Sequence, residues 1–460
     1  MSLPFRLLAI VVLGFIPELA AKSPNFVVIF CDDLGYGDLS CYGHPTIQTP
    51  NLDRMATEGV KFTQFYAAAP VCTPSRAGLL TGRLPVRSGM CSDKRRVLFP
   101  NSAGGLPQKE ITLAEGLKTK GYATAAIGKW HLGHLPQYLP TSNGFDTYFG
   151  IPYSNDMDRL ASAPKYREAL FNPKVEYFNV PLLRDTKEIE RPAEQRTITR
   201  RYTEETIKFI KAKKDKPFFV YLAHSLPHVP LFRDKPFVGV SKRGLYGDVI
   251  EEIDWSVGQV LKTLQDEGLA ENTLVWFTSD NGPWLIFDTH GGSAGLLRDG
   301  KGSTWEGGMR EPGIAWWPGK IKPHTSTAIA STMDIYTTCL TLAGAKVPQD
   351  RVVDGVNLSS VLFKGGKGPR DTIFFYRGEQ LYAVRKGAWK AHYITRAAYG
   401  RSQPEKHDPP VLYHLGHDPA EKHDLAKENP EVLAEIAKVI QQHNAKLVRG
   451  ENQLNTLIQQ

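Results

Sequence analysis

The 460-residue sequence is poor in cysteine, with only five: Cys31, Cys41, Cys72, Cys91 and Cys339. No two of them form a CxxC pair and their spacing is irregular, which excludes a zinc ribbon and a disulfide-dense scaffold. An odd number leaves at least one thiol for another purpose. A single bridge between Cys41 and Cys91 is compatible with the sequence, which offers no way to test it.

The sequence also lacks dense blocks of charge and internal repeats. Its 56 Lys and Arg exceed its 48 Asp and Glu by eight, spread over the chain. This mildly basic balance fits an anionic substrate better than a nucleic acid, so no nucleic-acid partner is expected. With 41% hydrophobic and 23% charged residues the composition is globular, which excludes a disordered chain. The length predicts about three domains, or one large fold with a smaller addition.

Only one long apolar run stands out, at residues 7–16. Arg6 precedes it and Ala20 and Ala21 follow it, a pattern typical of a secretory signal. The run is too short to cross a bilayer. We therefore expect residues 1–21 to be a signal peptide and the protein to be exported, periplasmic or secreted, with no membrane span. Leu19 stands where a small residue is preferred, and a buried first strand or helix is the alternative.

Four short apolar runs each lead into a polar cluster, at residues 25–30, 122–127, 217–223 and 273–278. Runs of this length predict strands buried on both faces. Helical patterns separate them, at residues 112–120, 203–214 and 249–264. Strands that alternate with helices predict an α/β fold with a largely parallel sheet, which binds ligands at the carboxyl ends of its strands.

The composition shifts after Asp354, and residues 363–370 (FKGGKGPR) are typical of a linker. Strand-like pieces follow at 372–376, 381–385 and 389–394, and then a helix with Asn429 as N-cap and Pro430 at its first position. We therefore expect a main domain at 22–365 and a smaller C-terminal domain at 366–460, with an antiparallel sheet and a helix. Residues 152–200 are irregular and polar, which predicts a long loop that crosses over the site.

Two pairs of oxygen ligands follow predicted strands: Asp32 with Asp33, and Asp280 with Asn281. Without neighbouring Cys or His ligands, such oxygens favour a hard cation, calcium or magnesium. Calcium tolerates the irregular geometry that two strand ends would provide. Each pair alone is common in turns, but both at strand ends indicate a metal site.

Cys72 lies in the segment 71–78, Val-Cys-Thr-Pro-Ser-Arg-Ala-Gly. A buried structural cysteine is the ordinary interpretation. A thiolate phosphatase would need an arginine six positions after the cysteine, but position 78 is glycine and Arg76 lies only four residues on. That spacing excludes the phosphatase.

The pattern Cys-x-Pro-Ser-Arg at 72–76, with Ala-Gly-Leu-Leu-Thr-Gly-Arg after it, resembles the signature of the type I sulfatases, which depend on formylglycine. Further family-like segments extend the resemblance from residue 24 to about 425: 32–38 (DDLGYGD), 128–133 (GKWHLG), 150–154 (GIPYS), 279–282 (SDNG) and 300–302 (GKG). It implies an alkaline phosphatase-like fold, with a large mixed sheet between helices and a smaller C-terminal α+β domain.

The resemblance also implies a mechanism. A formylglycine-generating enzyme would convert Cys72 to an aldehyde, whose hydrate offers two hydroxyls. One Ca²⁺ ion would be held by Asp32, Asp33, residue 72, Asp280 and Asn281. One hydroxyl would attack sulfur and expel the alcohol, leaving a sulfo-enzyme, and the second hydroxyl would then lose its proton and expel sulfate, which regenerates the aldehyde.

The remaining roles come from the same resemblance. Arg76 should hold the diol, and Lys129 and Lys301 should neutralise the sulfate oxygens. His228 should protonate the leaving alcohol, and His131 should take the diol proton in the elimination step.

Two further positions concern the substrate. Ser154 matches a hydroxyl of the sulfate pocket, and His392 is expected to border the substrate. Outside such a motif context, a lone Ser or Lys is usually a surface residue.

These features predict a sulfuric-ester hydrolase of the arylsulfatase type, acting on a sulfated carbohydrate or an aryl sulfate. Two alternatives stay open: a phosphonate or phosphate monoester hydrolase on the same fold, and a non-catalytic binder of sulfated glycans in which Cys72 is never converted. The sugar and the oligomeric state are not predicted.

Overall fold

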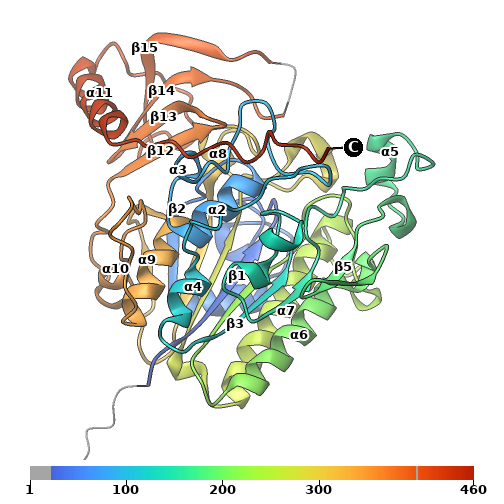
Figure 1. The fold of residues 1–460 in the computed structure, drawn as a ribbon. Coiled ribbons are helices and arrows are strands. Elements are labelled where there is room, and N and C mark those ends of the chain that lie inside the picture. The colour runs from blue at the N-terminus through green and yellow to red at the C-terminus, as the bar shows by residue number, and fades with distance from the viewer. Residues whose placement is uncertain (1–21, 400–401, 460) are drawn as a thin grey trace, which may run out of the picture.

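The computed structural model describes residues 22–399 and 402–459, so the expected signal segment lies outside the described residues. Within them the chain builds two β-sheets of unequal size, with helices packed against both (Figure 1). The large mixed sheet and the small antiparallel C-terminal sheet confirm the predicted α/β fold class.

The large sheet has 11 strands in the order β10-β2-β9-β8-β1-β7-β3-β4-β5-β6, with β11 beside β2. Its centre is parallel: β1 pairs with β7 and β8, and β3 pairs with β7 and β4. Antiparallel β9 then joins β8 to β2, which makes the sheet mixed. The strands are β1 Asn25–Cys31, β2 Val60–Tyr66, β3 Ala123–Gly128, β4 Thr147–Gly150, β5 Leu182–Arg184, β6 Lys187–Glu190, β7 Phe218–Ala223, β8 Thr273–Ser279, β9 Arg310–Trp316, β10 His324–Ser326 and β11 Ala330–Ser331.

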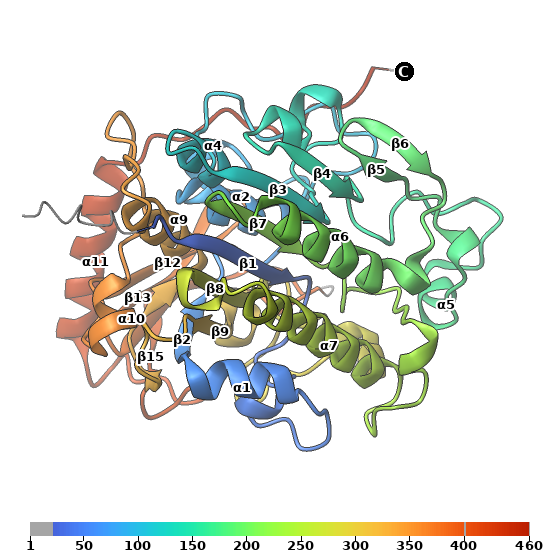
Figure 2. The same ribbon diagram turned by 90° about the horizontal axis from the view of Figure 1, so that it is seen from below.

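Helices cover both faces of this sheet (Figure 2). The alternation along β1 shows why: Val27 and Ile29 enter one core, and Phe26 and Val28 enter the other. The first core is closed by α1 Pro50–Glu58, α6 Ile198–Lys213 and α7 Leu245–Asp266. The second is closed by α2 Cys72–Thr81, α4 Leu113–Lys118, α9 Thr332–Leu342 and α10 Ser359–Lys364. Short helices α3 Pro85–Ser88, α5 Tyr166–Phe171 and α8 Glu306–Met309 lie in the connections.

The C-terminal sheet is antiparallel, in the order β12-β13-β14-β15. Ile436 of the helix α11 Pro430–Ala445 packs on its inner residues Val384, Ala391 and Leu412. The strands are β12 Thr372–Arg377, β13 Gln380–Lys386, β14 Trp389–Thr395 and β15 Glu405–His414. After α11 the chain returns to the large domain, where the Gln453 amide donates to the Gly89 carbonyl at 3.0 Å.

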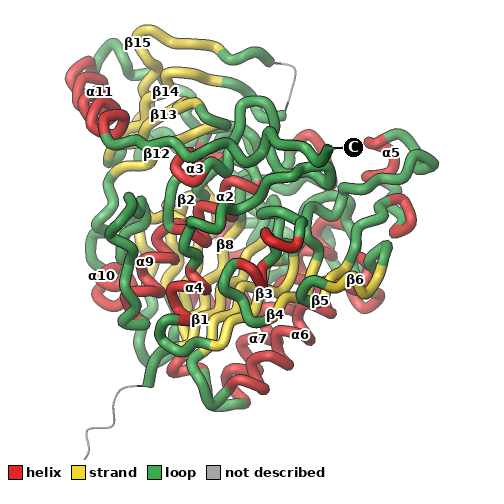
Figure 3. The backbone as a smooth tube through the Cα atoms, viewed as in Figure 1, coloured by secondary structure: helices red, strands yellow, loops and turns green. Residues whose placement is uncertain are grey.

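Some local expectations were wrong or incomplete. The sequence did not predict β15, which contains Pro409 and Pro410 and forms the outer edge of the sheet, where a missing N–H is tolerated. Asn429 is the N-cap residue of α11 and Pro430 its first residue, as predicted, but the Asn429 side chain donates to the Leu425 carbonyl and not to a helix amide. The segment 152–200 is not wholly irregular, because β5 and β6 extend the large sheet (Figure 3).

All five cysteines are free thiols in the described structure, so the Cys41–Cys91 bridge is not formed. Across residues 22–399 and 402–459, no helix combines the length and the apolar character needed to cross a membrane.

Candidate active site

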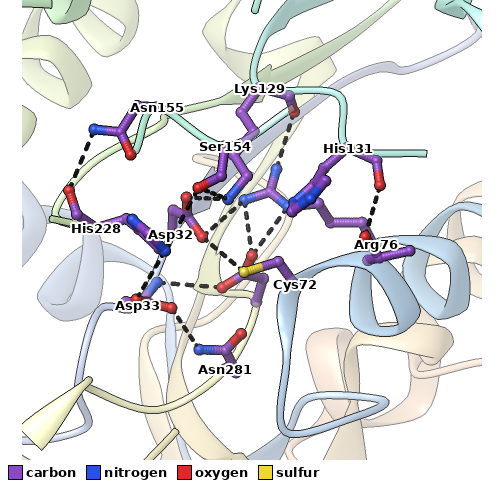
Figure 4. Close-up of polar contacts among 12 residues, drawn as sticks. Asp32, Asp33, Cys72, Arg76, Lys129, His131, Ser154, Asn155, His228 and Asn281 are labelled. Atoms are coloured by element: carbon purple, nitrogen blue, oxygen red, sulfur yellow. Dashed lines mark hydrogen bonds and ion pairs between the residues drawn. The ribbon is translucent and has the colours of Figure 1, made fainter. Parts of the chain in front are cut away.

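The polar clusters predicted at strand ends meet at one edge of the large sheet (Figure 4). Strands β1, β7, β8 and β3 are neighbours and run parallel, so their carboxyl ends coincide. Asp32 and Asp33 follow β1, Asp280 follows β8 and Lys129 follows β3. Cys72 comes from elsewhere, as the first residue of α2, where the helix N-terminus is partially positive.

Asp32, Asp33, Asp280 and Cys72 form one compact group, with one ligand atom of each lying within 4.8 Å of all the others. The Cys72 thiol donates to Asp32 Oδ1 at 3.3 Å, and the Asp33 amide donates to Asp280 Oδ1 at 3.2 Å. Asp33 adopts a left-handed backbone with φ of 65°, which an Asp tolerates better than most residues. All four side chains are buried.

Burial and neighbouring charges raise the pKa values of two of these acids and lower the pKa of the third. Burial raises the pKa of Asp33 to about 6 against the opposing charge of Lys301, and burial together with Asp32 raises that of Asp280 to about 7. Burial also opposes the ionisation of Asp32, but the Lys129 ammonium and other cations outweigh it and hold its pKa well below the usual range. Burial, reinforced by Asp32, raises the pKa of the Cys72 thiol well above its usual value, so an unconverted Cys72 is a protonated thiol and a poor nucleophile.

Arg76 links the Asp280 carboxylate to the chain that follows strand β3. Its Nε donates to Asp280 Oδ2 at 3.0 Å, and its Nη2 lies 2.8 Å from the same oxygen. Nη1 donates to the Lys129 carbonyl at 3.0 Å. Because Arg76 lies one helical turn after Cys72 on α2, these bonds set the orientation of the helix start toward the acids.

Two lysines complete the charge balance. Lys129 Nζ lies 2.5 Å from Asp32 Oδ2, and Lys301 Nζ lies 2.7 Å from the Asp33 carboxylate. Lys301 also lies 4.2 Å from the centre of the Trp284 ring, a cation–π contact. Both ammonium groups are buried, and both act on the charge of Cys72.

His131 is buried beside the acidic cluster, and its hydrogen bond fixes its tautomer. Its Nε2 lies 2.9 Å from the Leu98 carbonyl and must donate to it, which leaves Nδ1 with a lone pair and, among the described residues, no hydrogen-bond partner. Burial and Lys129 lower the pKa of His131 well below its usual value. The ring is therefore neutral.

His228 has the opposite tautomer, because its Nδ1 donates to the Val229 carbonyl at 2.5 Å. Its Nε2 faces Ser154 Oγ at 3.5 Å and Asp33 Oδ2 at 3.6 Å. Burial and Lys301 lower the pKa of His228 well below its usual value, so the resting ring is neutral. The negative charge of a bound ester would raise that pKa.

Ser154 also belongs to the cluster, accepting a hydrogen bond from Lys129 Nζ at 3.2 Å. His392 does not. It is fully buried, its Nε2 lies 2.7 Å from Glu421 Oε1, and its ring packs on Trp305. The structure gives no support to the expectation that His392 borders the substrate, because the residue faces the contact between the two sheets.

The donor set fits a hard cation. Asn281 Nδ2 donates to Asp33 Oδ1 at 2.7 Å, whereas the buried Asn281 Oδ1 has no hydrogen-bond partner among the described residues. An unpartnered amide oxygen beside three carboxylates is a ligand set that Ca²⁺ prefers. The five predicted metal-binding positions therefore lie together.

Sequence reasoning missed three residues that support the site. Thr73 Oγ1 donates to the His131 carbonyl at 3.0 Å, and Asn155 Nδ2 donates to the His228 carbonyl at 3.4 Å. The Trp284 ring packs between Lys301 and His228. Their nearness to recognised motifs was the only available signal, because Thr73 follows Cys72, Asn155 follows Ser154 and Trp284 lies three residues after Asn281.

Comparison with known proteins identifies the class. Residues 24–345 match the family model described as sulfatase, and residues 368–460 match the C-terminal region of aryl-sulfatase. Fold and site together are those of a sulfatase, and the chain belongs to the sulfatase family. The resemblance predicted from the motifs is therefore confirmed.

Particular relatives agree with this assignment. The chain is 42% identical to N-acetylgalactosamine-6-sulfatase of Canis lupus familiaris, over 95% of this chain and 88% of the relative. It is also 42% identical to arylsulfatase A of Homo sapiens, over 91% of this chain and 87% of the relative. Among solved structures, PsFucS1 sulfatase from Pseudoalteromonas sp. superimposes with a TM-score of 0.83 at 30% identity, covering 95% of this chain and 92% of the other.

Proposed function

We propose that this sulfatase releases inorganic sulfate from a sulfated carbohydrate and also accepts small aryl sulfates, with a formylglycine made from Cys72 and one Ca²⁺ ion. The observation that carries the proposal is the placement of Cys72 at the start of α2, within a group of carboxylates and 3.3 Å from Asp32. The relative named N-acetylgalactosamine-6-sulfatase supports a sulfated amino sugar as the type of substrate.

The chain's own side chains would bind and orient the ester. Lys129 and Lys301 offer two buried ammonium groups to the sulfate oxygens, and Ser154 offers a hydroxyl. Asp32, Asp33, Asp280 and Asn281 would hold the cation through their oxygens. When bound, Ca²⁺ supplies Lewis-acid activation of an oxygen nucleophile, and the hydrated aldehyde at position 72 supplies that oxygen.

The two histidines would handle protons in different steps. His228, with Nε2 toward Ser154 and Asp33, would donate a proton to the leaving alcohol. His131, with its free Nδ1, would accept a proton when the aldehyde is regenerated. We further propose that residues 1–21 direct export and that a formylglycine-generating enzyme converts Cys72.

The test begins with the mass of the peptide that spans residue 72, from protein made in its native host. An aldehyde or its hydrate is expected, and an intact thiol in active enzyme would contradict the proposal. Cys72→Ala should lower sulfate release from 4-nitrophenyl sulfate by at least ~10³-fold, because the nucleophile is gone. Matched 4-nitrophenyl phosphate and phosphonate esters should be poorer substrates, and faster turnover of either would favour the phosphoester alternative.

A further inference from the structure

A cavity of about 140 Å³ lies directly beside the candidate active site, between the large domain and the C-terminal sheet. One water needs only roughly 10–15 Å³ of such space, so the cavity can hold a larger group. Val71 and Gly302 line it, and they are the immediate neighbours of Cys72 and Lys301. Figure 1 shows β12 and β13, which supply its opposite wall, above α2 and α3.

Among the described residues, the lining of this cavity includes three arginines: Arg96 from the loop after α3, Arg377 at the end of β12 and Arg396 after β14. None of the three forms an ion pair with a carboxylate of the described residues. Among the described residues that line the cavity, Asp93 is the one acid, and its carboxylate already accepts from the Glu379 amide at 2.8 Å and from Gln380 Nε2 at 3.0 Å.

The guanidinium groups keep free donors. Arg377 Nη1 donates to the Ala397 carbonyl at 3.2 Å and to the Arg396 carbonyl at 3.4 Å, and Arg396 Nε donates to the Ser402 carbonyl at 2.9 Å. Each guanidinium has five N–H groups, so most of them have no hydrogen-bond partner among the described residues. Burial, together with the charges of Arg396 and Arg96, lowers the pKa of Arg377 to about 10. Three like charges gathered in one cavity repel one another, and a bound anion would relieve that repulsion.

Two packed aromatic rings connect the arginine side of this cavity to Lys301 of the candidate active site. Arg96 stacks on the Tyr399 ring at 4.0 Å, and Tyr399 packs on Trp284 with ring centres 5.2 Å apart. Trp284 in turn contacts Lys301 at 4.2 Å. These contacts link Arg96 to Lys301 through two rings, so the cavity lies next to the lysines of the candidate active site.

We infer that Arg96, Arg377 and Arg396 form an anion subsite that binds a second negatively charged group of the substrate. This inference rests on the proposed function and narrows its substrate class to oligosaccharides that carry two anionic groups, one of them the sulfate ester that is cleaved. The second group is a sulfate or a carboxylate, both of which match the planar donor fork of arginine.

The test measures binding to full-length, calcium-loaded Cys72→Ala protein by calorimetry. The probes are a monosulfated disaccharide, its disulfated counterpart, and a monosulfated disaccharide with a uronate. At least one dianionic probe should bind ~10-fold or more tighter than the monoanionic one, since its second anion would accept charge-assisted hydrogen bonds from the arginines. Which dianionic probe gains affinity identifies the second group as sulfate or carboxylate. The gain should shrink as salt is raised.

Substitutions of the cavity arginines then test whether the tighter binding of the dianionic probes comes from the proposed subsite. Arg96→Gln and Arg396→Gln should each remove most of it and leave monoanionic binding within about twofold. Arg95→Gln is the matched control, because Arg95 lies next in sequence but its Nη2 donates to Asn101 Oδ1 at 2.7 Å and it does not line the cavity. Equal affinity for all probes, absence of binding, or an equal loss in Arg95→Gln would overturn the inference. A failure of the proposed function would instead appear as a lack of sulfate release by protein that carries no substitution at position 72.

Discussion

Burial raises the pKa values of two carboxyl groups in the acidic cluster, and this makes the stability of the fold depend on pH. In the metal-free protein Asp33 and Asp280 have pKa values raised to about 6 and about 7, so they retain protons that the unfolded chain has lost. The metal-free fold therefore loses stability as pH rises from about 4 to 7. A bound cation reverses the sign, because it requires both carboxylates to be ionised.

We accordingly predict that calcium affinity falls by roughly 100-fold or more between pH 8 and pH 5, since a group of pKa 7 is ionised in about 1% of molecules at pH 5. Calorimetry in two buffers of different ionisation enthalpy should detect protons released on binding at pH 6. Affinity independent of pH would contradict these pKa values.

His228→Ala tests the role of a single side chain. We expect kcat/KM on a sugar sulfate to fall ~10²–10⁴-fold, and less than ~10-fold on 4-nitrophenyl sulfate, whose leaving group needs little protonation. His224→Gln is the control, because His224 is buried near Ser256 at 3.4 Å and lies outside the acidic cluster. Equal losses on both substrates in His228→Ala would argue against a general acid.

At the scale of elements, a buried polar network docks the C-terminal sheet onto the large domain. Lys390 of β14 contacts Glu306 Oε1 at 2.9 Å and Glu421 Oε1 at 3.0 Å. Glu306 in turn accepts from Tyr66 at 2.6 Å. Burial opposes the ionisation of Glu306, but Lys390 and nearby arginines lower its pKa to about 2. Glu306 lies five residues after Lys301, so this network also supports the loop that carries the lysine.

Lys390→Met should lower the free energy of unfolding by about 3 kcal/mol or more, because it leaves buried carboxylates without their main counter-charge. Lys386→Met is the matched control at the end of the neighbouring strand, where the partly exposed pair with Asp371 contributes only about 0–1 kcal/mol. Urea unfolding followed by tryptophan fluorescence would measure both. A loss in Lys390→Met no larger than in Lys386→Met would show that the network does not stabilise the sheet contact.

The sequence predicted some strands clearly and missed others. β1 and β8 were clear, because each is a continuous apolar run paired on both sides in the sheet. The edge strand β15 was missed because its two prolines and polar residues resemble a loop until neighbouring β14 provides a partner.

At the scale of the whole molecule, the site assembles segments that are far apart along the chain. The Asp33 and Asp280 positions are separated by 247 residues and joined by a backbone-to-carboxylate hydrogen bond. This cation-binding site exists only in the folded chain, so a cation that binds there stabilises the fold.

Calcium should therefore raise the melting temperature by a few degrees at 100 times its Kd, where linkage contributes about 2.7 kcal/mol. Excess chelator should reverse the shift, as scanning calorimetry would show. Asp280→Asn should melt at a temperature that calcium changes little, and a full calcium response in that variant would exclude Asp280 as a ligand.

The motifs around Cys72, Asp32 and Asp280 were sufficient to predict the family, the fold class and the cluster at the sheet edge. The strand-end clusters are local, because Asp32 and Asp280 each follow a strand directly and parallel strands bring such ends together, whereas Cys72 is identified by the motif around it. Other properties arise from packing between distant segments. The raised pKa of Asp280, the burial of His392 against Trp305 and the arginine cavity depend on which surfaces meet, since burial and the distance between charges are set by the folded chain and no short pattern encodes them.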